Sequence, residues 1–320
     1  MKIVILSYAG GLKELLSSEL DKLGFKADRV DYTKPLAPQL SYANVLINGL
    51  GTVDKSIIDS CPNLKLIHQV GIGIDNVDVK YCTSKSIYVA NVPHSNHVSV
   101  AEHTIFLMLF FSKNMKNAET SLQRRRIINI QGSELKDKNL FVIGLGATGM
   151  EVSRLAKCFR MNVIGVTKHP DKKRVTENLE FVNEIHGPDR LSEFLPTADY
   201  ISIHTPLTDE TKGMIGSKEF SLMKKSAYLV NVARASLVDR NELFLALSQK
   251  RLAGAAFDVF WEEPANPDDR LFNLDNFVWT PHTAGWTKES SMLAVKTIVE
   301  NINRISRGQP PSTAINLVSK

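Results

Sequence analysis

The segment from residue 140 to residue 159 constrains the fold more than any other part of this sequence. Residues 140–143 form an apolar run, Leu-Phe-Val-Ile, that leads directly into Gly-Leu-Gly-Ala-Thr-Gly and then into a helical pattern. Gly144 permits a tight turn, Gly146 lets a pyrophosphate approach the backbone, and Gly149 lets the helix pack closely on the strand. The start of the helix offers unpaired N–H donors. This order predicts a dinucleotide site at Gly144, Gly146, Ala147, Thr148 and Gly149.

Short apolar runs alternate with helix-like segments on both sides of this motif. Such alternation is typical of βαβ units, because parallel strands need a crossover between them. A helix is expected at 12–23, ending at Gly24. Strands are expected at 3–8, 29–32, 45–48, 64–70 and 87–91, and again at 140–143, 163–166, 200–204, 227–232, 253–257 and 277–280. The sequence therefore predicts two α/β domains with doubly wound parallel sheets, in keeping with its 320 residues.

The domain boundaries are expected at two helices. Residues 99–113 are apolar on nearly every face, which predicts a buried helix at a domain junction. A second helical pattern at 290–306 is followed by a tail that has no place in a nucleotide-binding sheet, so we expect the tail to return to the first domain. The predicted domains are a discontinuous flavodoxin-like domain, 1–98 plus 287–320, and a Rossmann domain, 99–286. Two chain crossings would then form a hinge beside a cleft.

Composition excludes several classes of protein. With 43% hydrophobic and 23% charged residues, the chain is neither disordered nor fibrous. Cys61, Cys82 and Cys158 lack paired spacing, so neither a disulfide framework nor a zinc site is predicted. The amino-terminal apolar run is too short for a signal peptide, and no stretch approaches the roughly 18 residues of a membrane span. We therefore expect a cytoplasmic protein with no membrane partner.

The charge pattern gives no sign of nucleic-acid binding. The formal net charge is +5, and its one dense cluster runs from Arg124 to Arg126 without interleaved aromatic residues. No nucleic-acid partner is expected.

The end of the strand after the glycine loop indicates which dinucleotide binds. An NAD site places an acid there, about twenty residues beyond the glycines. This chain carries Thr167 and Lys168 instead, followed by Lys172, Lys173 and Arg174. These cations suit the 2′-phosphate of NADP, although a lysine makes a less specific contact with a phosphate than the two-pronged guanidinium of an arginine does. We favour NADP and keep NAD as the alternative.

Three chemically suited residues follow successive strands of the second sheet, where ligands of such sheets bind. Arg234 follows the strand at 227–232, Glu263 the strand at 253–257, and His282 the strand at 277–280. Reduction of a 2-oxo acid needs a cation for the carboxylate, a proton donor, and a group that keeps this donor charged. A guanidinium, an imidazole and a neighbouring carboxylate meet these needs without a metal. The sequence predicts a dehydrogenase of small 2-hydroxy acids.

At these residues the chain resembles the D-isomer-specific 2-hydroxyacid dehydrogenase family over nearly its whole length. The glycine loop is joined by the motifs at 70–76 (Val-Gly-Ile-Gly-Ile-Asp-Asn), 100–103 (Val-Ala-Glu-His), 204–207 (His-Thr-Pro-Leu), 232–234 (Val-Ala-Arg), 258–260 (Asp-Val-Phe) and 281–282 (Pro-His). The resemblance implies that Arg234, Glu263 and His282 form the catalytic triad. It also implies that the discontinuous domain binds the substrate and that members commonly dimerise around the junction helix, so a homodimer is expected.

The resemblance implies further contacts. The cofactor would be held by Thr205, Pro206, Val232, Ala233, Arg234, Asp258, His282 and Ala284, in addition to the glycine loop, Thr167 and Lys168, with Asp258 near the nicotinamide carboxamide. The substrate carboxylate would accept backbone N–H bonds at Val70 and Gly71, next to Ile72 and opposite Arg234 and His282.

Several departures from the family leave the substrate open. Ala235 replaces a frequent glycine, a tryptophan common before the glycine strand is absent, and Trp261 and Trp286 are unusual. We expect glyoxylate or hydroxypyruvate reduction, because the chain ends at Lys320 without the regulatory domain of many phosphoglycerate dehydrogenases. A short 3-phosphoglycerate dehydrogenase and formate or phosphite oxidation remain alternatives.

Two readings fall outside this enzyme class. A nucleotide-sensing relative without turnover is disfavoured by the intact triad. A methyltransferase is disfavoured by Thr167, because that fold would place an acid there.

Overall fold

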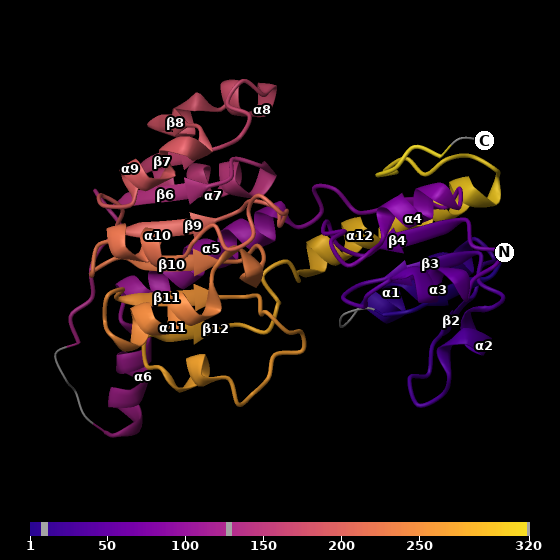
Figure 1. Ribbon diagram of the computed structural model, residues 1–320, viewed down its shortest axis with the longest axis horizontal. Coiled ribbons are helices and arrows are strands. Elements are labelled where there is room, and N and C mark those ends of the chain that lie inside the picture. The colour runs from indigo at the N-terminus through magenta and orange to yellow at the C-terminus, as the bar shows by residue number, and fades with distance from the viewer. Residues whose placement is uncertain (8–11, 126–129, 319–320) are drawn as a thin grey trace. The chain divides into compact units, whose positions relative to one another are not determined.

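A computed structural model describes residues 1–7, 12–125 and 130–318, and its chain divides into two compact units. The first unit comprises Met1–Ser95 and Trp286–Lys320, and the second comprises Asn96–Gly285 (Figure 1). Tyr8, the end of a predicted strand, and Arg126 of the basic cluster lie outside the described residues, as does the side chain of Arg174.

The first unit is built on a five-stranded parallel sheet with the order β2-β1-β3-β4-β5. This is the strand order of flavodoxin-like folds. The two central strands are buried along their whole length because helices cover both faces. The strands are β1 (Ile3–Ile5), β2 (Ala27–Arg29), β3 (Val45–Asn48), β4 (Leu66–Gln69) and β5 (Tyr88–Ala90).

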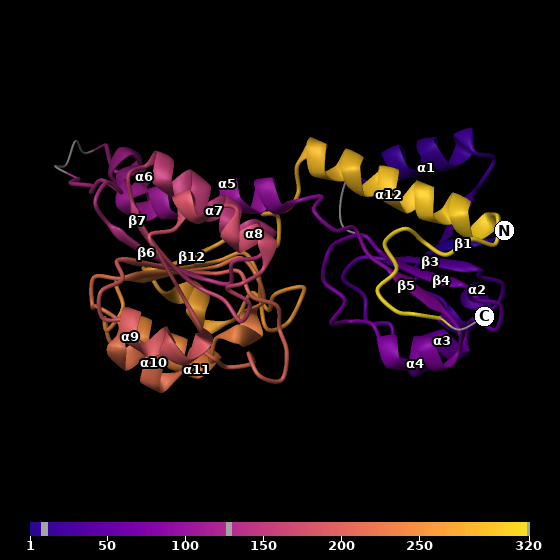
Figure 2. The same ribbon diagram turned by 90° about the horizontal axis from the view of Figure 1, so that it is seen from above.

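Helices far apart in the sequence cover one face of this sheet together. α1 (Leu12–Lys22) and α12 (Lys288–Ser306) share a buried core with the sheet, and Figure 2 shows them on the face opposite α3 (Lys55–Asp59) and α4 (Val79–Ser84). α2 (Leu36–Leu40) precedes β3. Beyond α12, Ile315 donates its N–H to the carbonyl oxygen of Val89 at 2.7 Å. The carboxyl-terminal segment is thus part of the first unit.

The second unit is built on a seven-stranded parallel sheet with the order β12-β11-β10-β9-β6-β7-β8. The direction of winding reverses between β6 and β9, which creates a topological switch point at the carboxyl ends of these two strands. The strands are β6 (Asn139–Ile143), β7 (Asn162–Val166), β8 (Glu184–His186), β9 (Tyr200–Ile203), β10 (Tyr228–Asn231), β11 (Gly254–Phe257) and β12 (Phe277–Trp279).

Helices lie on both faces of the seven-stranded sheet. Figure 2 shows α5 (His97–Ser112), α6 (Met115–Gln123), α7 (Ala147–Cys158) and α8 (Lys173–Thr176) on one side, and α9 (Leu191–Phe194), α10 (Ser217–Leu222) and α11 (Arg240–Ser248) on the other. Short 3-10 turns occur at Leu179–Phe181, Pro188–Arg190, Ala235–Leu237 and Arg270–Asn273. The first and last residues of the unit lie together, because a Cβ on Gly285 would come within 2.6 Å of Asn96 Nδ2.

The predicted fold class is confirmed: both sheets are parallel and doubly wound. Two strands differ from the prediction: the strand predicted at 29–32 lies at Ala27–Arg29, and β8 was not predicted. The helix predicted at 99–113 is present as α5, and in the single chain it leaves Val98 43% and Phe106 52% exposed.

Two features are absent from the described part of the chain. None of its helices combines the length and the apolar character that a membrane span requires. Nor do its His, Cys, Asp and Glu side chains gather in a group of three or more that could bind a metal ion.

Candidate active site

The three glycines of the glycine loop occupy three different environments. Gly144 has φ +102°, and a Cβ there would come within 2.7 Å of the His204 carbonyl. A Cβ on Gly149 would overlap the carbonyl oxygen of Gly144, so the start of α7 packs against the loop as closely as glycine allows. By contrast, a Cβ on Gly146 would have no other atom within 4 Å. The space in front of Gly146 is therefore open.

The start of α7 faces this open space. Gly146 is the N-cap residue and accepts the first helical hydrogen bond from Met150 N at 3.0 Å. The N–H groups of Ala147 and Thr148, in the first helical turn, have no intrahelical acceptor. Open space, backbone donors and the positive end of the helix dipole together fit the diphosphate of a dinucleotide.

The loop after β9 lies against the glycine loop. A Cβ on Gly144 would come within 2.8 Å of Thr205 N, so Thr205, followed by Pro206, lies at the switch point, where ligands of such sheets bind. The neighbouring His204 donates to or accepts from Ser202 Oγ at 2.6 Å, and burial lowers the pKa of His204 to about 3. His204 is thus a neutral structural residue.

The end of β7 carries no carboxylate. Thr167 donates its N–H to the carbonyl oxygen of His186 at 2.9 Å, which aligns it with β8. Lys168 forms an ion pair with Glu210, with 2.6 Å between Nζ and Oε2, and both side chains are largely exposed. Lys173 pairs with Glu177 at 3.5 Å. The cations predicted at this edge are present, and Lys168 already has an anionic partner.

Glu263 and His282 form a hydrogen-bonded pair. His282 Nδ1 lies 2.7 Å from Glu263 Oε2, and the side chains are 29% and 22% exposed, respectively. The other carboxylate oxygen, Oε1, accepts the N–H of Phe260 at 3.0 Å. Burial acts to raise the pKa of Glu263, but the hydrogen bond and charge of His282, the Phe260 N–H and the charge of Arg234 together outweigh it and lower that pKa. Glu263 is therefore an anion at neutral pH.

Arg234 is held by a tight turn after β10. The fully buried Asn231 donates from Nδ2 to the carbonyl oxygen of Arg234 at 2.9 Å and accepts the Ala233 N–H at 3.1 Å. Arg234 Nη1 donates to the Ala233 carbonyl at 2.8 Å. The positive charge of Arg234 is one of the influences that lower the pKa of Glu263. Sequence reasoning missed Asn231, whose only signal was an amide at the end of an apolar strand.

Asp258 organises the backbone around His282. Its buried carboxylate accepts hydrogen bonds from Thr280 Oγ1 at 2.5 Å and from the N–H groups of Thr283 and Ala284, each at 2.8 Å. Two of these bonds go to Oδ1 and one to Oδ2. A carboxylate has about four acceptor positions, so Oδ2 retains capacity for one more donor.

The cofactor residues predicted around this segment lie in the same core. Val232 is 8% exposed and Ala284 is 4% exposed, and both belong to the hydrophobic cluster that includes β6, α5 and α7. Val232 and Ala284 therefore belong to one hydrophobic core of the second unit.

One prediction for the first unit needs correction. The N–H of Val70 donates to the carbonyl oxygen of Asn48 at 2.8 Å within the sheet, so it is not available to a substrate. Gly71 and Ile72 use their carbonyl oxygens as acceptors for Val92 N and Asn91 Nδ2, and their N–H groups have no partner in the described part of the chain. Donation to a carboxylate is therefore restricted to Gly71 and Ile72.

Trp261 holds the loop that carries Glu263 in place through a hydrogen bond and a ring contact. Its Nε1 donates to the carbonyl oxygen of Val238 at 3.1 Å, and its ring stacks on Phe257 at 5.7 Å. The guanidinium of Arg240 lies 5.9 Å from the Trp261 ring and pairs with Asp269 at 2.8 Å. Trp261 is a packing residue of the second unit.

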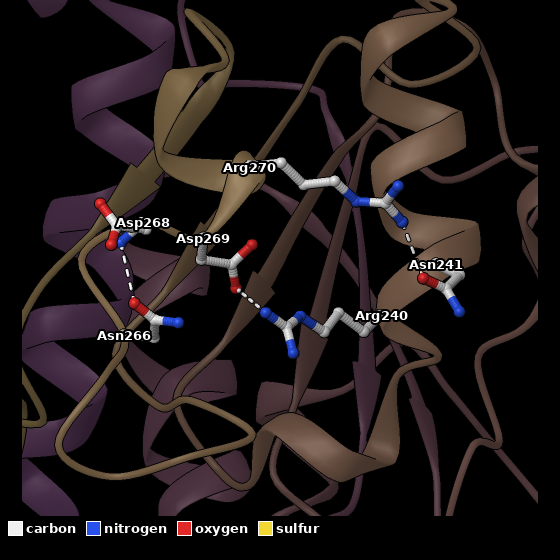
Figure 3. A pocket seen from close by; sticks show the side chains of 6 residues that line it. All are labelled: Arg240, Asn241, Asn266, Asp268, Asp269 and Arg270. Atoms are coloured by element: carbon white, nitrogen blue, oxygen red, sulfur yellow. Dashed lines mark hydrogen bonds and ion pairs between the residues drawn. The ribbon is translucent and has the colours of Figure 1, made fainter.

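A surface pocket of about 490 Å³ lies beside this loop but contains none of the predicted site residues. Figure 3 shows that its charged and polar groups face one another: Arg240 pairs with Asp269, and Arg270 donates to Asn241 Oδ1 at 2.7 Å. Its lining consists of Arg240, Asn241, Asn266, Asp268, Asp269 and Arg270. The pocket is distinct from the Glu263–His282 pair.

Comparisons with known proteins agree with this arrangement. Residues 105–284 match the family described as "D-isomer specific 2-hydroxyacid dehydrogenase, NAD binding domain". The chain is 34% identical to a glyoxylate reductase of Aeropyrum pernix over 274 residues, 82% of this chain and 80% of that protein. It is 38% identical to a D-3-phosphoglycerate dehydrogenase of Methanocaldococcus jannaschii over 286 residues, 88% of this chain.

The lengths of these relatives differ. The chain spans about half the length of the phosphoglycerate dehydrogenases that it matches, 53% of the M. jannaschii protein. Among solved structures, D-lactate dehydrogenase from Aquifex aeolicus complexed with NAD and lactic acid has a TM-score of 0.87 at 27% identity, with 99% of this chain and 100% of that chain covered. From the glycine loop, the Glu263–His282 pair and these similarities together, we conclude that the chain belongs to the D-isomer specific 2-hydroxyacid dehydrogenase family.

Proposed function

We propose that the protein reduces a small 2-oxo acid to the D-2-hydroxy acid, or catalyses the reverse reaction, with a nicotinamide dinucleotide as redox partner. The observation that carries this proposal is the 2.7 Å contact between His282 Nδ1 and Glu263 Oε2. The bound cofactor supplies the hydride for the carbonyl carbon. Everything else in the reaction falls to the side chains of the protein.

In this proposal His282 is the proton donor. The ionised Glu263 fixes the ring through Nδ1, which leaves Nε2 to protonate the carbonyl oxygen. Arg234 binds the substrate carboxylate and polarises the carbonyl, since its fork can make two parallel hydrogen bonds. In the reverse direction the neutral imidazole takes the hydroxyl proton.

We assign cofactor binding to the second unit and substrate binding to the first. The open space at Gly146, the first turn of α7 and the spare acceptor position of Asp258 Oδ2 support a dinucleotide, with the nicotinamide carboxamide donating to Asp258. The N–H groups of Gly71 and Ile72 are the proposed donors to the substrate carboxylate. The domain boundaries follow the two compact units.

For the cofactor, we keep the preference for NADP over NAD. Thr167 and Lys168 stand where a ribose-binding acid would be, and the exposed pair between Lys168 and Glu210 costs little to separate. NAD binding has the support of the family description and of the Aquifex enzyme. Titration with both reduced cofactors decides between them.

For the substrate, we propose glyoxylate or hydroxypyruvate. The loops 49–52 and 70–74 contain no lysine or arginine, and they present Leu50, 51% exposed, and Ile72, 40% exposed. These loops therefore carry no cationic side chain that could pair with a phosphate group. A short 3-phosphoglycerate dehydrogenase is the second candidate, supported by the 38% identity to the M. jannaschii enzyme.

The test is a rate screen. Each reduced cofactor is combined with glyoxylate, hydroxypyruvate, pyruvate, a bulkier 2-oxo acid and 3-phosphohydroxypyruvate. We expect the highest kcat/KM with glyoxylate or hydroxypyruvate. A clear preference for the phosphorylated acid would favour the second candidate, and tight cofactor binding without turnover on any acid would favour a nucleotide sensor.

We also propose a homodimer through α5. Val98 and Phe106 are exposed apolar residues of this helix. The centroid of the Phe106 ring lies 6.3 Å from that of Phe110, so the apolar surface extends to Phe110. Sedimentation of the protein and of Phe106→Glu tests this: the variant should sediment as a monomer, and an unchanged dimer would place the interface elsewhere.

A further inference from the structure

A histidine on α5 reaches the segment that carries His282. His103 Nε2 lies 3.0 Å from Thr280 Oγ1, although the two residues are 177 positions apart in the chain. Thr280 Oγ1 in turn lies 2.5 Å from Asp258 Oδ1. The three side chains form a continuous chain of hydrogen bonds on one side of the His282 segment.

The direction of these hydrogen bonds follows from counting protons. The Thr280 hydroxyl has a single hydrogen, and the ionised Asp258 carboxylate can only accept, so this hydrogen points to Asp258. His103 Nε2 must then be the donor to Thr280 Oγ1. Burial lowers the pKa of His103 more than the charge of Asp258 raises it, so the ring is neutral, with its hydrogen on Nε2.

The chain of hydrogen bonds ends on a strained backbone. His282 has φ +54°, in the left-handed region that is unfavourable for a residue with a Cβ. On one side its N–H donates to the Thr280 carbonyl at 2.9 Å, and on the other the Asp258 carboxylate holds the N–H groups of Thr283 and Ala284. Asp258 therefore accepts hydrogen bonds from residues on both sides of His282, and these bonds keep His282 in this conformation.

We propose that His103 is a positioning residue for His282, acting through Thr280 and Asp258. By donating to Thr280 it keeps the hydroxyl oriented towards Asp258, and this holds the carboxylate against the backbone of residues 283 and 284. His103 does not touch the reacting atoms. The inference rests on the proposed function in one respect only, which is that His282 donates the proton.

The test compares variants that keep and remove one donor. His103→Gln retains an N–H donor near the position of Nε2, whereas His103→Leu removes it at similar volume. We expect kcat to fall about tenfold in His103→Leu and to stay within about threefold of wild type in His103→Gln, with the cofactor dissociation constant unchanged in both. Equal losses in the two variants would overturn the proposal, because packing alone would then explain them.

A double-mutant cycle tests the route through Thr280. Thr280→Val removes the hydroxyl without changing the shape of the side chain. If His103 acts through that hydroxyl, His103→Leu should have no further effect on kcat in the Thr280→Val background. Additive losses would show that His103 acts by another route.

Hydrogen exchange gives a readout that does not depend on activity. The amides of Thr283 and Ala284 should exchange faster in His103→Leu and Thr280→Val, but not in His103→Gln, because only the first two weaken the grip of Asp258. Thr104→Val is the matched control: this buried neighbour on α5 bonds only to the Val100 carbonyl, at 2.8 Å, and should alter neither exchange nor kcat. Unchanged exchange in His103→Leu would refute the proposal.

The two hypotheses fail in different ways. Wild-type protein without turnover but with the expected exchange pattern would sink the proposed function and leave the hydrogen-bond chain standing. Normal turnover of the wild-type protein, with no change in kcat or exchange in His103→Leu, would support the proposed function and overturn the positioning role of His103.

Discussion

Glu263 holds His282 by its Nδ1 atom, 2.7 Å from Oε2, so the opposite ring nitrogen, Nε2, is the atom left to exchange a proton with a ligand. The proposed role of His282 as proton donor requires this orientation, because one ring nitrogen is held by the carboxylate and the other can face the ligand.

Replacing His282 should abolish reduction and spare cofactor binding. Asparagine in His282→Asn keeps polarity but has no titratable proton, so we expect kcat to fall by about 10³-fold while the dissociation constant of the cofactor changes little. Single-turnover kinetics and fluorescence titration measure the two effects. His169→Asn, at an exposed position after β7, is the control. Near-normal turnover of His282→Asn would show that another group donates the proton.

Arg234 should affect the substrate far more than the cofactor. Arg234→Lys keeps the positive charge but loses the two-pronged geometry, so we expect kcat/KM for the 2-oxo acid to fall by about 100-fold, equivalent to one or two charge-assisted hydrogen bonds. Steady-state kinetics over a range of acid concentrations measures this. The exposed Arg307→Lys should behave as wild type. A change confined to the cofactor constant would contradict the role given to Arg234.

The lowered pKa of Glu263 predicts the acid side of the pH profile. A carboxyl group with a depressed pKa stays ionised below its usual value of 4.5, so its support of His282 is present at neutral pH and is lost only as the pH falls through that lowered pKa. In Glu263→Gln the anion is gone at every pH. We expect kcat of Glu263→Gln to be lower than that of wild type at neutral pH and to lack the acid-side loss that wild type shows when Glu263 is protonated, measured as kcat and kcat/KM against pH. Glu262→Gln, one residue away, should leave the profile unchanged, and a profile of Glu263→Gln identical to wild type would rule out this pairing.

Two substitutions in the glycine loop should have different consequences, one for cofactor binding and the other for folding stability. In Gly146→Ala the added methyl group enters open space, so the protein should fold while both reduced cofactors bind at least about tenfold more weakly. In Gly149→Ala the methyl group overlaps the carbonyl oxygen of Gly144, and we expect a loss of about 3 kcal/mol in the free energy of unfolding. Thermal unfolding and fluorescence titration of both variants separate the effects. Unaltered cofactor binding in Gly146→Ala would place the diphosphate elsewhere.

The pair between Lys168 and Glu210 should tune the choice of cofactor. Lys168→Ala should weaken NADPH but not NADH, whereas Glu210→Gln frees the lysine and should tighten NADPH by only about threefold, because an exposed ion pair is weak. The ratio of the two dissociation constants is the measurement, with Lys218→Ala on α10 as control. Tighter binding of NADH than of NADPH by the wild-type protein would refute the preference for NADP.

The sequence predicted those parts of the protein whose signals are local. The glycine loop and its flanking strand and helix are contiguous. Arg234, Glu263 and His282 each come after a parallel strand of the same sheet, so the order of elements was enough to predict that they lie at one end of that sheet. β2 and β8 escaped because each is a three-residue edge strand that is largely exposed, and such strands carry no apolar alternation.

Long-range hydrogen bonds could not be predicted in the same way. The contact between His103 and Thr280 depends on how α5 lies on the sheet, which no local pattern encodes. The hydrogen bond from the Val70 N–H to the Asn48 carbonyl depends on the register of β3 and β4. A register shifted by one residue would have left the Val70 N–H without this partner.

The place of α12 has a consequence for biosynthesis. This helix supplies Ala294, Val295, Ile298 and Ile302 to the core that α1 and the first sheet share, yet the ribosome delivers it only after the whole second unit. At typical elongation rates the nascent amino-terminal strands wait roughly 10–40 s with one face uncovered. The inner unit can complete its own core in that interval, so the segment made first is the one that finishes folding last.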